Sequence, residues 1–218
     1  MNEQYDPVPL AGHTLSRRIL PQVDVSLVSG KADEGLTRRQ LLERGAVGGL
    51  AAAMAISFNG RLLSPTQAKA EDVPLTSLTA AEGALLEAVG DVLLPGASDA
   101  GIANFVDAQL AKENPLLMIK YFDWPGPLTD FYSNGLAALD KASQTAYGAV
   151  FMKTTPAQQT ELMGQFLGGD VPGWDGPPAP LFYFSVRGDA VDVVYGTVEG
   201  FQRLDIPYMP HILPQERW

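Results

Sequence analysis

The sequence predicts a mostly α-helical protein: a compact helical domain with long Pro/Gly loops and an extended C-terminal tail, preceded by a signal segment. Three observations predict it. Apolar residues recur at helical spacing through the second two-thirds of the chain, clusters of Pro and Gly separate these stretches, and an Arg-Arg pair precedes an uncharged apolar run nearer the N-terminus. We therefore expect two parts, a leader with its signal peptide at residues 1–70 and the helical domain at residues 71–218.

Composition and charge exclude several classes of function. The chain has 218 residues, a net charge of −10 and no cysteine, so it cannot form a disulfide, a thiolate metal site, an iron–sulfur cluster or a covalently attached haem. Residues 71–218 hold seven basic and nineteen acidic side chains. A domain this acidic is a poor binder of nucleic acid or of anionic lipid surfaces, because both need a basic face.

The signal segment has the order basic, apolar, small-x-small, which is the plan of an export signal. Arg38 and Arg39 come first, Gly45 to Phe58 is a run of fourteen residues without a charge, and Ala68 and Ala70 close the segment. The arginine pair, followed by Gln-Leu-Leu, resembles the twin-arginine signal. We expect cleavage after Ala70 and a protein that the twin-arginine translocon delivers to the periplasm.

This segment has two other interpretations. A helix of fourteen residues spans about 21 Å, which is short of the roughly 30 Å hydrocarbon core, so a permanent membrane anchor is not expected. Thr37 and Gln40 also fit a helix capping box, so the segment could instead begin an ordinary amphipathic helix.

Helices are expected in order along the domain. Thr79 and Glu82 form a capping box for a first helix that Pro95 stops, and a second runs from Ile102 to about Lys112. A third begins near Thr129 after a Pro/Gly loop.

The C-terminal half continues this pattern. Thr155-Pro156 starts a helix that ends at Gly168-Gly169, and a long Pro/Gly loop follows over residues 170–180. Leu181 to Val198 is apolar nearly all round and is expected to be a central helix, with a strand over Val191–Tyr195 as the alternative. Phe201 to Trp218 is expected to be extended.

Residues for catalysis are scarce. His211, within a Pro-rich stretch, is the single histidine after residue 70, and there is no Gly-x-Ser-x-Gly turn and no His-Glu-x-x-His helix. Asp189 and Asp192 are spaced i, i+3 and could in principle do acid–base work, but we assign them to a solvated face. No catalytic, cofactor-binding or metal-binding residue is predicted, and the composition favours a binding surface.

Two segments resemble a known family. "LTAAEGALLEAVGDVLLPGASDAG", which starts at Leu78, and "VVYGTVEGFQRLDIPYMPHILP", which starts at Val193, resemble the gluconate 2-dehydrogenase subunit 3 family over roughly residues 75–218. The resemblance implies a small, helical, exported subunit without catalytic residues. Its implied partner is a large dehydrogenase subunit of the glucose–methanol–choline type, which holds FAD and oxidises the sugar or alcohol, and a cytochrome c subunit commonly passes the electrons on.

The contact with that partner is expected to use aromatic residues. We expect Trp174, in the loop that reaches Pro180, and Tyr208, Met209 and Trp218 in the tail to form it. Two alternatives stay open: a self-contained periplasmic enzyme that uses an Asp/Glu pair, and a periplasmic binding or scaffold domain without a redox partner.

Overall fold

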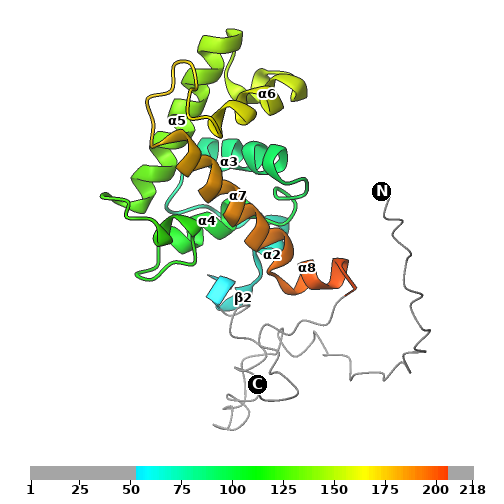
Figure 1. Ribbon diagram of the computed structural model, residues 1–218. Coiled ribbons are helices and arrows are strands. Elements are labelled where there is room, and N and C mark those ends of the chain that lie inside the picture. Colours follow the sequence, from blue (N-terminus) through cyan, green and yellow to red (C-terminus); the bar gives the residue numbers. More distant parts are fainter. Residues whose placement is uncertain (1–52, 206–218) are drawn as a thin grey trace, which may run out of the picture. The chain divides into compact units, whose positions relative to one another are not determined.

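The computed structural model describes residues 53–205, and it confirms the predicted fold class (Figure 1). The described elements are a two-stranded hairpin, seven α-helices and two 3-10 helices: β1 (Ile56–Phe58), β2 (Arg61–Leu63), α2 (Pro65–Ala70), α3 (Ala80–Leu93), α4 (Ile102–Leu110), η2 (Met118–Tyr121), α5 (Leu128–Tyr147), η3 (Phe151–Lys153), α6 (Pro156–Phe166), α7 (Ala179–Tyr195) and α8 (Val198–Arg203). None of the described helices is long and apolar enough to cross a membrane.

Two helix starts lie where the sequence predicts them, and each has a capping box. The Thr79 hydroxyl oxygen accepts a hydrogen bond from the backbone N–H of Glu82, the Glu82 carboxylate accepts one from the backbone N–H of Thr79, and α3 begins at the next residue. Thr155 and Gln158 make the same exchange before α6, with proline at its first position. These boundaries are local in origin, because each box satisfies backbone N–H groups that a helix start leaves free.

The helix α7 lies at the centre of the described residues. It packs against α3, α4, α5, α6 and α8, and it runs from the part that holds α5 and α6 to the part that holds α2 and α8 (Figure 1). Phe182 is fully buried between Phe131 of α5 and Phe166 of α6. The prediction of a central helix is confirmed, and the strand alternative for Val191–Tyr195 is wrong.

The chain after α7 differs from its prediction. The helix ends at Tyr195, because Thr197 caps a new helix by accepting a hydrogen bond from the backbone of Gly200 at 3.1 Å. Phe201 therefore lies inside α8, where an extended tail was expected to have begun. Residues 206–218, which include His211, lie outside the described residues.

The hairpin and α2 are regular structure within residues 56–70, where the sequence predicts a signal segment. Asn59 and Gly60 both have positive φ, of 49° and 75°, and join β1 to β2. An Asn-Gly pair in this conformation gives the tight turn that matches the twist of two antiparallel strands. Ser64 and Gln67 then form a third capping box, and α2 begins at Pro65.

A buried aspartate holds the connection into α3. Both carboxylate oxygens of Asp107, on α4, accept hydrogen bonds from backbone N–H groups of Thr76, Ser77 and Leu78, at distances between 2.7 and 3.0 Å. A single side chain thus satisfies three donors in a segment without regular structure.

Candidate subunit interface

An apolar stripe lies on the outward side of α7. Phe184, Val191 and Tyr195 are 52%, 40% and 42% exposed, although apolar side chains of this helix also fill the core. Their spacing of seven and then four residues puts them on one face of the helix. Large exposed apolar residues gathered on one face, with aromatic members among them, are typical of protein–protein contacts.

A residue next to the 3-10 helix η2 lies beside this stripe and widens the apolar surface. Phe122, directly after η2, is exposed and lines a groove of about 190 Å³ together with Phe184 and Val191. Gly188 forms the floor: a Cβ atom at this position would come within 2.9 Å of the Met118 side chain. The missing side chain therefore lets η2 lie close against α7. We call Phe122, Phe184, Val191 and Tyr195 the α7 face.

Asp189 holds η2 against α7 from the inner side. Its Oδ1 accepts a hydrogen bond from the backbone N–H of Met118 at 2.9 Å, and its Oδ2 accepts one from the Tyr132 hydroxyl at 2.5 Å. The side chain is fully buried, so the assignment of Asp189 to a solvated face is wrong. The physical reason is that η2 and α5 cover this side of α7, which helical spacing alone cannot reveal. Asp192 is half-buried.

Burial sets the protonation of this group. It raises the pKa of Asp189 to about 7; the hydrogen bonds from Met118 and Tyr132 oppose that rise, and the nearby charge of Asp192 adds to it. Burial also raises the pKa of Asp192 and holds that of Tyr132 well above its usual range. A raised pKa is a property of general acids, but both carboxylate oxygens of Asp189 are already occupied by internal donors.

The residues predicted from the sequence lie in different places. Trp174 is half-buried: its ring packs against Phe166 and Phe182 at 4.7 and 5.5 Å between centroids, and its Nε1 donates to the carbonyl of Pro177 at 2.6 Å. The Trp174 side chain therefore makes these contacts inside its own domain. The other predicted contact residues, Tyr208, Met209 and Trp218, lie outside the described residues.

Of the four predicted signal residues, the structure describes two, Ala68 and Ala70. Ala68 is fully buried in α2, while Ala70 at the end of that helix is exposed. Arg38 and Arg39 lie outside residues 53–205.

A second cleft lies between α5 and the Pro/Gly loop before α7. It has a volume of about 580 Å³, and Trp124, Lys141 and Asp175 are among its lining residues. Lys141 and Asp175 form an ion pair with each other across it, and both are exposed. Within the described range, no group of three or more His, Asp or Glu side chains lies close enough to hold a metal ion.

Comparison with known families decides the assignment. The model of the family "Gluconate 2-dehydrogenase subunit 3" matches residues 80–211, more than half of the chain. The chain belongs to this family. No curated protein and no solved structure matches it.

Membership in gluconate 2-dehydrogenase subunit 3 confirms the resemblance drawn from the two sequence segments. The family consists of small subunits of dehydrogenase complexes, so the chain partners with other dehydrogenase subunits. All four residues of the α7 face lie within the matched range. The sequence shows that α7 is apolar nearly all round, but it does not separate the outward residues of this helix from its core residues. One feature of the sequence could have indicated an exposed apolar face: a helix that is apolar on every side is either covered completely by its own chain or leaves an apolar face for a partner.

Proposed function

We propose that this chain is the non-catalytic small subunit of a periplasmic FAD-dependent sugar or alcohol dehydrogenase. It binds a catalytic flavoprotein of the glucose–methanol–choline type, supports the maturation of that subunit and supplies the twin-arginine signal that exports both. FAD belongs to the partner, and a cytochrome c subunit is a further candidate member of the complex. Family membership and the export pattern around Arg38 and Arg39 support this function.

The observation that carries the proposal is the α7 face. A subunit of an enzyme complex needs a surface that another subunit covers. The α7 face is an aromatic-rich, half-exposed surface formed by the central helix and by Phe122 beside it. Its floor is closely packed, because Asp189 accepts a hydrogen bond from Met118 of η2 and Gly188 leaves room for η2 against α7. A preformed apolar surface needs little ordering on binding, which favours a stable contact. We therefore assign the catalytic flavoprotein as the partner that covers this face.

The test is copurification of the partner on a tagged small subunit expressed with its native neighbours. Replacing Phe184 and Tyr195 with alanine should weaken the complex at least tenfold, because truncating a buried aromatic contact costs roughly 2 kcal/mol or more. The readout is the amount of large subunit and of flavin absorbance in the eluate. Leu167→Ala is the matched control, since Leu167 is 55% exposed but lies just after α6, outside the α7 face.

Each outcome has a distinct meaning. If the wild-type protein captures no flavoprotein, the assignment as a subunit of a flavin-dependent dehydrogenase fails. If it captures one and the double variant retains it fully, the α7 face is not the contact. In that case Tyr208→Ala and Trp218→Ala test the aromatic tail as the contact instead.

A further inference from the structure

Residues 53–73, which we call the N-terminal segment, are built into the helical domain. Met54 is 2% exposed and belongs to the main core, together with Leu86 and Phe105. Leu63 and Ala68 are 1% and 0% exposed and form a second apolar cluster, against which Ala108 of α4 packs. The N-terminal segment thus buries apolar side chains in two places.

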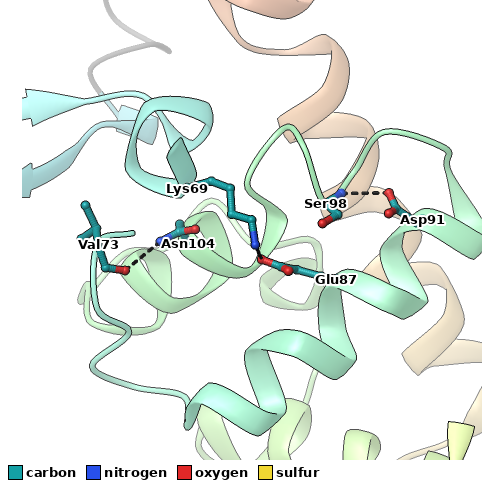
Figure 2. Close-up of polar contacts among 6 residues, drawn as sticks. All are labelled: Lys69, Val73, Glu87, Asp91, Ser98 and Asn104. Atoms are coloured by element: carbon teal, nitrogen blue, oxygen red, sulfur yellow. Dashed lines mark hydrogen bonds and ion pairs between the residues drawn. The ribbon is translucent and has the colours of Figure 1, made fainter. Parts of the chain in front are cut away.

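Polar contacts join the N-terminal segment to three different parts of the domain. The Lys69 ammonium lies 2.6 Å from the Glu87 carboxylate of α3 (Figure 2). The Asn104 side chain of α4 donates to the Val73 carbonyl at 3.2 Å, which Figure 2 also shows. Ser64 donates to Glu199 of α8 at 2.7 Å, across 135 positions of sequence.

The first residue of the segment is held in the same way. The carbonyl oxygen of Ala53 accepts hydrogen bonds from the side chains of Gln109 and Lys112, at 2.9 and 2.6 Å. The side chain of Gln109 is fully buried, so without Ala53 its amide would lose a hydrogen-bond partner in the interior.

The absence of a side chain at Gly101 leaves room for the start of α2. Gly101, just before α4, has a φ of 83°, and a Cβ atom there would lie 2.2 Å from the carbonyl oxygen of Pro65. Both the backbone conformation and the close approach require glycine. The space at Gly101 is therefore fitted to the first turn of α2.

These contacts bear directly on the cleavage expected after Ala70. The bond lies at the end of α2, where the N–H of Glu71 donates to the carbonyl of Gln67 at 2.9 Å. Ala68, the first small residue of the expected small-x-small site, is fully buried. Cleavage within folded proteins concentrates in exposed segments whose backbone is free of hydrogen bonds. A peptidase could reach this bond only after α2 unwinds and its buried cluster opens.

The geometry points to a mature protein that keeps residues 53–73: the chain is not cut after Ala70, and any cut that removes the leader falls before Ala53. The N-terminal segment lies outside the residues that the family model matches, which begin at 80. The apolar run Gly45–Phe58 is then shared between the signal and the core, to which it contributes Met54 and Ile56.

The first test is the mass and N-terminal sequence of the protein purified from its native host. We expect an N-terminus at or before Ala53. An N-terminus at Glu71, or at any position after Ala53, overturns the inference. This measurement uses the unaltered chain and needs no partner, so its result is separate from the success or failure of the proposed function.

The second test compares two neighbouring leucines in the same purified protein. Leu63 is 1% exposed and Leu62 is 64% exposed. Leu63→Ala should lower the melting temperature by roughly 5–10 °C, because it leaves a cavity in the second cluster, whereas Leu62→Ala should leave it unchanged within about 1 °C. Equal melting temperatures for both variants and the wild type would show that the segment is absent from the mature fold, and this too overturns the inference.

Discussion

The Asp189 carboxyl group links the protonation of one residue to the stability of the fold. Its pKa is about 7 in the folded protein and 3.8 as its ordinary value, so the folded state binds a proton more tightly than the unfolded state. The resulting stabilisation is complete below pH 4 and is lost as the pH rises through 7. Above that pH, a buried carboxylate must be held by only two hydrogen bonds, from Met118 and Tyr132.

Asp189→Asn is therefore expected to reduce the pH dependence of stability. An asparagine side chain can still accept from the Met118 amide, but it carries no charge to desolvate. Between pH 5 and pH 8, the wild type should lose roughly 2–3 kcal/mol of unfolding free energy more than the variant. Urea unfolding of both proteins at the two pH values measures this difference. Equal losses in both proteins would mean that Asp189 does not change its protonation in this range.

At the scale of elements, one glycine sets the distance between α5 and α7. Gly135 of α5 is buried against the ring of Phe182, and a Cβ atom there would lie 2.3 Å from that ring. Phe182 is itself fixed by Phe131 and Phe166, so it has little freedom to move away. Gly164, in α6, has no atom within 4 Å of such a Cβ.

Gly135→Ala and Gly164→Ala should consequently act in opposite directions. The first overpacks the core and is expected to destabilise the protein by about 1–3 kcal/mol. The second adds a better helix former at an exposed position and should stabilise by about 0.5–1 kcal/mol. Thermal unfolding of the two variants provides the comparison, and a stabilised Gly135→Ala protein would contradict the close packing of α5 on α7.

At the scale of the whole molecule, the chain combines an export pattern with a domain that has an outward apolar face. The proposed function joins the two: the domain binds the flavoprotein, and the arginine pair directs both to the translocon. This requires the complex to assemble before export, which suits a route that carries folded proteins.

Replacing Arg38 and Arg39 with lysine should therefore leave both subunits in the cytoplasm. Lysine keeps the charge but lacks the planar guanidinium group, with its fixed set of donors. Cell fractionation followed by a flavin assay of the periplasm measures the effect. Arg17 and Arg18 are a second pair without an apolar run close behind, so the same replacement there is the control and should not affect export. Normal export of the flavoprotein with the Arg38/Arg39 variant would contradict a shared signal.

Local chemistry determined what could be predicted from the sequence. The capping boxes at Thr79 and Thr155 place the starts of α3 and α6, because the hydrogen bonds that define them join residues three apart. The same kind of signal was present at Ser64 and at Asn59-Gly60. These signals compete with the arginine pair, the apolar run and Ala68-x-Ala70, which predict a cleaved signal over the same stretch.

By itself, the sequence determined the helical class, most helix positions and the motifs that indicate the family. Only the tertiary structure decided that Asp189 is buried while Phe184 is exposed, although both lie on α7. It also decided that residues 53–73 pack on the domain. The physical reason is that burial depends on which other elements cover a side chain. Those elements, such as η2 over α7 and α2 against α4, come from distant parts of the chain.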